Sequence, residues 1–137
     1  MIDKNYLGSW GESYAAKLYL KQGFSVLLKN SFNRVGKRLG EIDLIVQRHN
    51  LLVFVEVKTR ISGKFGLPEE AISYAKQKRL VRAVFWFLYK YPEYQTWQLR
   101  IDVCAILLSE AASVNARRDL DKFIKYSKII TNAVELN

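Results

Sequence analysis

Two neighbouring segments of alternating polarity constrain this 137-residue chain more than any other feature. Residues 39–48 and 51–60 are each long enough for a strand, and only His49 and Asn50 separate them. Alternation with a period of two is typical of strands with one buried face, and a two-residue connection is typical of an antiparallel hairpin. We therefore expect a β-hairpin in the middle of the chain, as part of a larger sheet.

Charged residues stand in this hairpin where alternation places partly buried side chains. Glu56 and Lys58 share a face with Phe54, and Asp43 shares a face with Ile45. A two-residue loop sets Asp43 opposite Glu56, and directly opposed residues have Cβ atoms about 4.5–5.5 Å apart. Two carboxylates at that distance repel each other unless a cation lies between them, and buried charges are costly unless they are paired or bind metal. The pattern predicts a metal site at Asp43 and Glu56, with Lys58 beside it.

These residue types suit phosphodiester hydrolysis. Carboxylate oxygens are ligands that Mg²⁺ or Mn²⁺ prefers. A bound ion polarises the phosphate, lowers the pKa of an attacking water and stabilises the leaving oxygen. Lys58 would orient or deprotonate that water, or stabilise charge on the phosphorane. The alternative interpretation is a solvent-facing hairpin with cross-strand ion pairs, which contribute little to stability. Because Asp43 stands opposite Glu56, we favour the site, with Asp43, Glu56 and Lys58 as catalytic residues.

The remaining segments predict a single mixed α/β domain over residues 1–137, with helices flanking a central mixed sheet. Ser9 and Glu12 form a capping-box pattern at the start of a first helix, and Pro68 suits the first turn of a second one. The tail from Ala116 is expected to be a short helix or irregular, and residues 126–136 have no assignment. The expected order, α-β-β-β-α-β followed by the tail, comprises a helix over 9–22, strands over 24–29, 39–48 and 51–60, a helix over 68–91 and a strand over 97–108.

A positive charge favours a polyanionic partner. The chain has 22 Lys and Arg against 13 Asp and Glu, a formal charge of +9, and nucleic acid is the commonest partner of such a surplus. Lys76 lies in the middle of the apolar stripe of the second helix, where it either extends outward to solvent or reaches a bound phosphate. For the loop residues the alternative is a plain charged loop. The candidate nucleic-acid-binding residues are Arg34, Lys37, Arg38, Arg60 and Lys76.

Several classes of protein are disfavoured by composition. The single cysteine, Cys104, lies in an apolar run, so it predicts a core residue in a reducing cytoplasm and no disulfide within the chain. No stretch approaches the ~20 apolar residues of a membrane span, and residues 1–6 lack the apolar core of a secretory signal. One histidine, His49, makes no zinc site. We expect a cytoplasmic protein with no membrane partner.

Two blocks of the hairpin resemble a known family. Asp43, followed by Glu56-Val57-Lys58, resembles the PD-D/E-x-K nuclease signature, with Ile42 where the signature has proline. Residues 40–45 and 53–60 look like the corresponding blocks of the YraN family of bacterial endonuclease-like proteins, which resembles the archaeal Holliday-junction resolvases. Further blocks that fall where that family has its own are Gly11-Glu12 with Ala15, Phe65-Gly66, residues 76–80 and residues 100–103.

The resemblance implies a restriction-endonuclease-like fold with the site on one edge of the sheet. It implies that Glu12 joins Asp43 and Glu56 as a metal ligand and catalytic residue. The implied activity is that of a Mg²⁺-dependent endonuclease, with DNA favoured over RNA and branched or structured DNA among the substrates. By analogy with resolvases, a homodimer is also expected.

Two other functions stay open at this point. One is a nucleic-acid-binding module of the same fold without significant catalysis, for which a broken metal site would be the mark. Asp43, Glu56 and Lys58 are all present, which favours the enzyme. The other is an adaptor that docks proteins through Trp86 and Tyr89 of the second helix, and it predicts that both are exposed.

Overall fold

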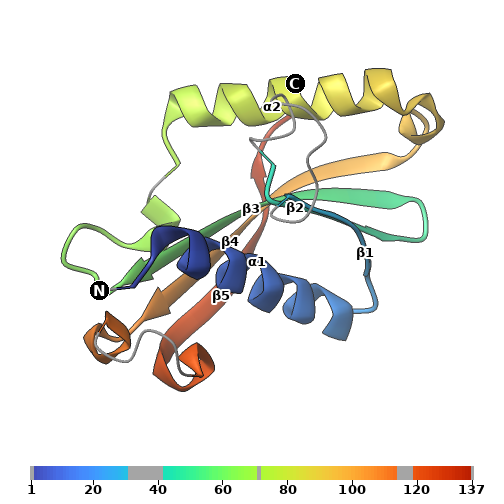
Figure 1. The fold of residues 1–137 in the computed structure, drawn as a ribbon. Coiled ribbons are helices and arrows are strands. Elements are labelled where there is room, and N and C mark those ends of the chain that lie inside the picture. Colours follow the sequence, from blue (N-terminus) through green and yellow to red (C-terminus); the bar gives the residue numbers. More distant parts are fainter. Residues whose placement is uncertain (1, 31–41, 71, 114–118, 137) are drawn as a thin grey trace.

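A five-stranded sheet with one α-helix on each face organises the molecule (Figure 1). The computed structural model describes residues 2–30, 42–70, 72–113 and 119–136. Strands lie in the sheet in their chain order, and all neighbours are antiparallel except the parallel pair β3 and β4. The elements are α1 (Lys4–Lys21), β1 (Ser25–Lys29), β2 (Leu44–Arg48), β3 (Leu51–Ile61), α2 (Tyr74–Lys90), β4 (Gln98–Leu108) and β5 (Ile124–Val134), with 3-10 turns at Pro68–Glu70, Pro92–Tyr94, Glu110–Ser113 and Leu120–Phe123. The mixed α/β class is confirmed.

Side chains of the central strands alternate between the two faces of the sheet and pack into two separate hydrophobic cores. On the α1 side, Val53 and Val55 pack with Ala15 and Tyr19. On the α2 side, Leu52 and Phe54 pack with the apolar face of α2, including Leu80, Val84 and Phe87. The sheet is therefore buried on both faces at its centre, and any charge there must be paired or bound.

The expected hairpin is confirmed, and its two strands differ in length. β2 pairs with β3 from Arg48 opposite Leu51 to Leu44 opposite Val55, around a turn in which His49 has a φ of 53°. β3 continues to Ile61, paired only with β4 on its other side as far as the structure describes the chain. The edge of β3 beyond Val55 is where β2 departs from the sheet.

Both expected helix starts were wrong. α1 is capped by Asp3, whose carboxylate accepts from the backbone N–H of Asn5 at 2.8 Å, so Ser9 and Glu12 lie inside the helix and form no capping box. Packing of Leu7 and Trp10 against the α1-side core explains the earlier start. α2 begins at Tyr74, because Ser73 caps it through the N–H of Lys76. Pro68 starts only a 3-10 turn.

The tail contains a strand that the sequence did not assign. β5 pairs antiparallel with β4, with register irregularities near each end of the pairing. Its residues are mostly half-buried or exposed, and Lys, Ser and Asn interrupt its apolar positions, so its alternation is weak. Neither α-helix in the described ranges is long and apolar enough to cross a membrane.

Candidate active site

Asp43 lies where β2 leaves β3, and hydrogen bonds fix it there. Its Oδ2 accepts from the backbone N–H of Val57 at 2.8 Å, so the carboxylate takes the place of a missing strand partner. Its own N–H donates to the carbonyl of Val55 at 3.2 Å, and its carbonyl accepts from Asn30 at 3.0 Å. Strand alternation stops here: regular alternation would place Ile42 on the face of Leu44, in the α1-side core, whereas Ile42 lies in the α2-side core.

Glu56 lies on β3 and faces α2. It is 3% exposed, and its Oε2 lies 3.2 Å from the Nζ of Lys76, which α2 supplies. Glu56 Oε2 accepts no hydrogen bond. Within the described ranges it is the single buried side-chain oxygen or nitrogen without a hydrogen-bond partner. An unsatisfied buried oxygen costs about 1–3 kcal/mol, more for a charged group. The charge of the Lys76 ammonium offsets part of this cost, but Oε2 still lacks a hydrogen bond in the middle of the sheet.

The carboxyl groups of Asp43 and Glu56 converge. The Asp43 side chain lies within hydrogen-bonding range of Glu56. Burial, together with the hydrogen bond and like charge of Glu56, raises the pKa of Asp43 to about 8, although the Val57 N–H and the Lys76 charge oppose the shift. The pair therefore holds a proton near neutral pH unless a cation replaces it. This is the proximity that the two-residue turn predicted.

A hollow of about 690 Å³ opens beside this pair, between the first half of α1 and the second half of β3. Gly11 allows the helix to approach, because a Cβ there would overlap the Oγ1 of Thr59. Asp43 lines the hollow, whereas Glu56 is not among its lining residues and faces Lys76 of α2. This α1–β3 hollow is lined by Ile2, Lys4, Leu7, Gly8, Glu12, Asp43, Val57, Lys58, Thr59, Arg60, Ile61, Phe65, Gly66 and Ser113.

The other predicted catalytic residues lie in the same hollow. Lys58 and Glu12 both line it together with Asp43. Glu12 comes from α1, where it is half-buried. In the described parts of the chain, no three side chains of the metal-ligating types Asp, Glu, His and Cys form a group able to hold an ion. The structure thus gathers two carboxylates, and metal ligation by Glu12 stays a prediction.

The predicted nucleic-acid-binding residues fall into three groups. Arg60 is exposed at the hollow. Lys76 points inward to Glu56, and its side chain is 20% exposed. It therefore does not extend outward to solvent, and its ammonium is already paired with Glu56 rather than left for a phosphate. Residues 34, 37 and 38 (Arg34, Lys37, Arg38) lie outside the described residues. Sequence reasoning missed Lys4, because Lys4 precedes the helix start expected at Ser9. It named Phe65 only within a block of the family resemblance and gave it no site role, because a lone Phe in a loop gives no periodic signal.

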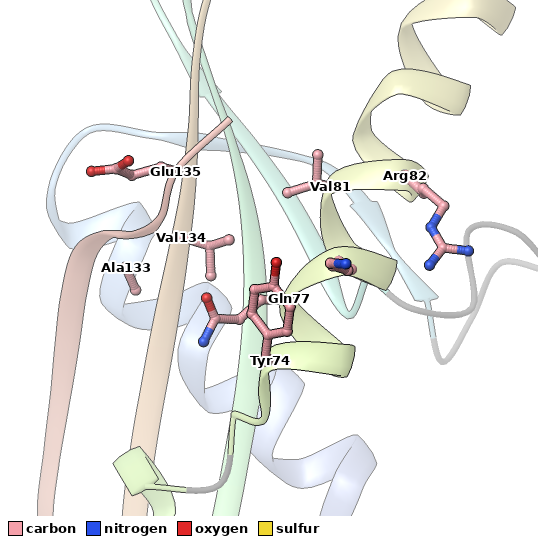
Figure 2. Close-up of a pocket in the computed structure, with 8 residues that line it drawn as sticks. Tyr74, Gln77, Val81, Arg82, Ala133, Val134 and Glu135 are labelled. Atoms are coloured by element: carbon pink, nitrogen blue, oxygen red, sulfur yellow. The ribbon is translucent and has the colours of Figure 1, made fainter. Parts of the chain in front are cut away.

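A second hollow, of about 530 Å³, lies between α2 and the end of β5 (Figure 2). Tyr74 and Gln77 of α2 stand beside Val134 there, and the Lys78 ammonium lies 4.6 Å from the Tyr74 ring centroid. Lys78 and Arg82 share this lining with Glu135, so its charge is mixed. It holds no converging acids, and we assign it no role.

The adaptor interpretation predicted that Trp86 and Tyr89 of α2 are both exposed, and only one of them is. Tyr89 is 77% exposed, as the adaptor interpretation predicted. Trp86 is half-buried against the α2-side core, with the Lys90 ammonium 5.2 Å from its ring.

A second buried acid, Asp102, forms an ion pair with Arg100. Arg100 donates two hydrogen bonds to it, at 2.8 and 2.9 Å. The Tyr19 hydroxyl donates at 2.7 Å, and the backbone N–H of Asn132 at 2.9 Å. The neighbouring Cys104 is buried, and burial raises the pKa of its thiol to about 12, so it is an inert core residue as expected.

Fold and site together define a mixed α/β protein with a paired-carboxylate site where a short strand leaves the sheet. The chain belongs to the family described as "Uncharacterised protein family UPF0102", whose model matches residues 11–106. A UPF0102 protein of Acinetobacter baumannii (strain SDF) is 35% identical over 137 residues, all of both chains. One of Natranaerobius thermophilus is 44% identical over 101 residues, 73% of this chain and 82% of that protein.

Proposed function

We propose that the protein is a divalent-metal-dependent endonuclease that hydrolyses phosphodiester bonds in DNA, with branched or structured DNA among its substrates. The observation that carries this proposal is the convergence of Asp43 and Glu56, with a buried Glu56 oxygen left without a hydrogen bond. Such a pair is unfavourable for folding alone and favourable for cation binding. The resemblance of the hairpin to the PD-D/E-x-K signature and to the YraN family adds a restriction-endonuclease-like fold to the proposal.

The residues present fit Mg²⁺ or Mn²⁺. Mg²⁺ keeps several waters and commonly takes one or two protein carboxylates, which is the number that converges here. The Oε2 of Glu56 offers an oxygen that no hydrogen bond uses, and Asp43 offers the carboxylate that lines the hollow. When bound, the ion would polarise the phosphate and lower the pKa of an attacking water.

Each side chain then has a defined task. Asp43 and Glu56 would hold the cation, and the Val57 N–H fixes the orientation of the Asp43 carboxylate. Lys58, in the same hollow, orients the attacking water or stabilises charge on the phosphorane. Arg60 at the rim binds the anionic backbone and carries no sequence information.

A cleavage assay with matched variants tests the proposal. Wild type is incubated with duplex, single-stranded and branched DNA and with Mg²⁺ or Mn²⁺, alongside Asp43→Asn and Lys58→Ala. Asp119→Asn and Lys125→Ala, exposed positions outside the hollow, serve as controls. We expect cutting by wild type and both controls and a loss of about 100-fold or more in each site variant, since one such group contributes 10²–10⁴-fold. Binding without cutting, unaffected by both site substitutions, would favour the non-catalytic module.

A second readout does not depend on turnover. Mg²⁺ that binds the folded state raises its stability by RT ln(1 + [Mg²⁺]/Kd), about 2.7 kcal/mol at one hundred times Kd. Wild type should show this increase in thermal unfolding, and Asp43→Asn should not. Sedimentation of the same samples tests the homodimer that the resolvase resemblance implies.

A further inference from the structure

Phe65 is the most exposed large hydrophobic side chain in the described part of the chain, at 89%. Single exposed apolar residues are common and need no explanation by themselves. The position of Phe65 is what distinguishes it, because it lines the α1–β3 hollow together with Asp43 and Lys58. An unsupported aromatic ring therefore stands next to the proposed site of cleavage.

The turn that carries Phe65 is held by its backbone. At its start, the Ser62 N–H donates to the carbonyl of Leu108 at 2.8 Å, and the Gly66 N–H donates to the carbonyl of Gly63 at 3.3 Å. Ser62 has a φ of 61° and Gly66 a φ of 104°. A positive φ is uncommon at a non-glycine residue and tends to occur at functional sites, where the surrounding structure maintains it. The chain returns to the fold at the buried Pro68.

Cations line the same hollow as the ring. Lys4, Lys58 and Arg60 are among its lining residues, and positive side chains suit a phosphate backbone. An aromatic face next to cations is the combination by which proteins hold unpaired nucleotides, with the ring stacking on a base and the cations on phosphates. In an intact duplex both faces of a base are covered by its neighbours, so a protein ring can reach only a base that is unpaired or displaced.

We propose that Phe65 stacks on an unpaired base of nucleic acid bound at the α1–β3 hollow and so selects substrates with an unstacked nucleotide beside the phosphate that is cut. This inference rests on the proposed function and adds a substrate class to it. Phe65 touches the base and takes no part in bond cleavage, so its removal changes substrate preference and leaves the chemistry at Asp43, Glu56 and Lys58 in place.

Equilibrium binding with a fluorescent base tests this. Two DNA duplexes differ only in one unpaired 2-aminopurine nucleotide, and binding is measured in Ca²⁺ to limit cutting. Wild type should prefer the duplex with the unpaired base and quench its fluorescence. Phe65→Ala should lose that preference by about 5- to 150-fold, the effect of one base–aromatic stack. Phe65→Trp should retain both preference and quenching, and Phe65→Leu, which keeps an apolar group without a ring, should lose the quenching.

Phe85→Ala is the matched control, because Phe85 is 51% exposed on α2 and outside the hollow. It should behave as wild type. Equal binding of both duplexes by wild type and Phe65→Ala, together with cutting that depends on Asp43, overturns the stacking inference and leaves the proposed function standing. Absence of any binding or cutting by wild type overturns both. Phe65→Ala could also lose binding to both duplexes to the same degree while its thermal midpoint stays unchanged. Phe65 would then contact nucleic acid without selecting an unpaired base, and the inference would again be overturned.

Discussion

Glu56 and Asp102 are both buried acids on adjacent strands, and their surroundings differ in almost every respect. In the β3–β4 register Glu56 stands beside Val103 and Asp102 beside Val55, one position apart, and they face opposite helices. Asp102 is 0% exposed and accepts four hydrogen bonds. Glu56 is 3% exposed and keeps an oxygen that accepts none. On one face of the sheet the buried acid is thus fully hydrogen-bonded, whereas on the other it has the Lys76 ammonium at 3.2 Å and an oxygen without a hydrogen bond.

The difference separates a structural acid from a candidate site. Buried polar groups in native proteins are almost always hydrogen-bonded, so an exception needs a reason. Asp102 joins β4 to α1 through Tyr19 and to β5 through Asn132. Glu56 has a second acid, Asp43, within hydrogen-bonding range, whose like charge repels it whenever both carboxyls are ionised, and its cationic neighbour is Lys76. Two carboxyls that destabilise the fold when no cation is bound, such as Asp43 and Glu56, are typical of a cation site.

Asp102→Ala should have the largest effect on stability. It leaves Arg100 as a partly buried charge without its partner and removes the acceptor for the Tyr19 hydroxyl. Breaking a buried ion pair from one side costs about 3–5 kcal/mol, so the urea midpoint should fall sharply. Mg²⁺ should stabilise this variant by as much as it stabilises wild type. A loss below about 1 kcal/mol would mean that the network contributes little and that the contrast with Glu56 is not one of stability.

The pH dependence of stability should next reveal the strain in the carboxylate pair, through Asp43. The pKa of Asp43 is raised to about 8, so between about pH 4 and pH 8 the folded state holds a proton that the unfolded chain has released. The free energy of unfolding should therefore fall as pH rises through this window, by at most about 1.4 kcal/mol per pH unit for one proton. The contribution is fully present below the ordinary pKa of an aspartate and is lost as pH passes 8.

Comparison with Asp43→Asn isolates this effect, because all other titrating groups are shared. The difference in unfolding free energy between the variant and wild type should grow from about pH 5 to pH 8, and saturating Mg²⁺ should reduce it. A difference that is constant over this range would show that Asp43 titrates at its ordinary pKa and that the two carboxyls do not interact in solution.

Lys76→Ala should destabilise by about 1–3 kcal/mol, less than Asp102→Ala. It removes the ammonium 3.2 Å from Glu56 and leaves a buried carboxylate whose nearest described partner is the Asp43 carboxyl. Adding Glu56→Gln should recover most of the loss, because the uncompensated charge is then gone. Urea unfolding of the single and double variants measures the coupling. If Glu56→Gln recovers nothing, Lys76 acts through its packing against the apolar stripe alone.

Features that depend on residues close together in the sequence were predicted, and features that depend on residues far apart in the sequence were not. The hairpin, its register and the convergence of Asp43 with Glu56 depend on alternation and a two-residue turn, which are local, and all were expected. The capping of α1 by Asp3 depends on Leu7 packing against residues distant in sequence. β5 depends on its pairing with β4, since its own pattern is weak. The Glu56–Lys76 contact joins two elements, so the sequence showed only that Lys76 lies on an apolar face.

Tyr19→Phe should have the smallest effect and yet test the comparison directly. The Tyr19 hydroxyl donates to Asp102 at 2.7 Å, and burial raises the pKa of Tyr19 well above its usual range, so the hydroxyl stays a donor. Its removal deletes one of four hydrogen bonds without leaving a buried charge unpaired, because the Arg100 guanidinium remains. The cost should be about 1.5 kcal/mol, the low end for a hydrogen bond to a charged group.

Tyr14→Phe is the matched control for this measurement. The Tyr14 hydroxyl lies on the same helix, 3.4 Å from the Ser127 Oγ, in a part-buried contact too long to contribute much. Its loss should cost less than about 0.5 kcal/mol in urea unfolding. Equal costs for the two variants would mean that the Asp102 network is no stronger than an ordinary surface contact. Asp102 would then be as poorly supported as Glu56, and hydrogen-bond satisfaction would no longer distinguish the structural acid from the candidate site.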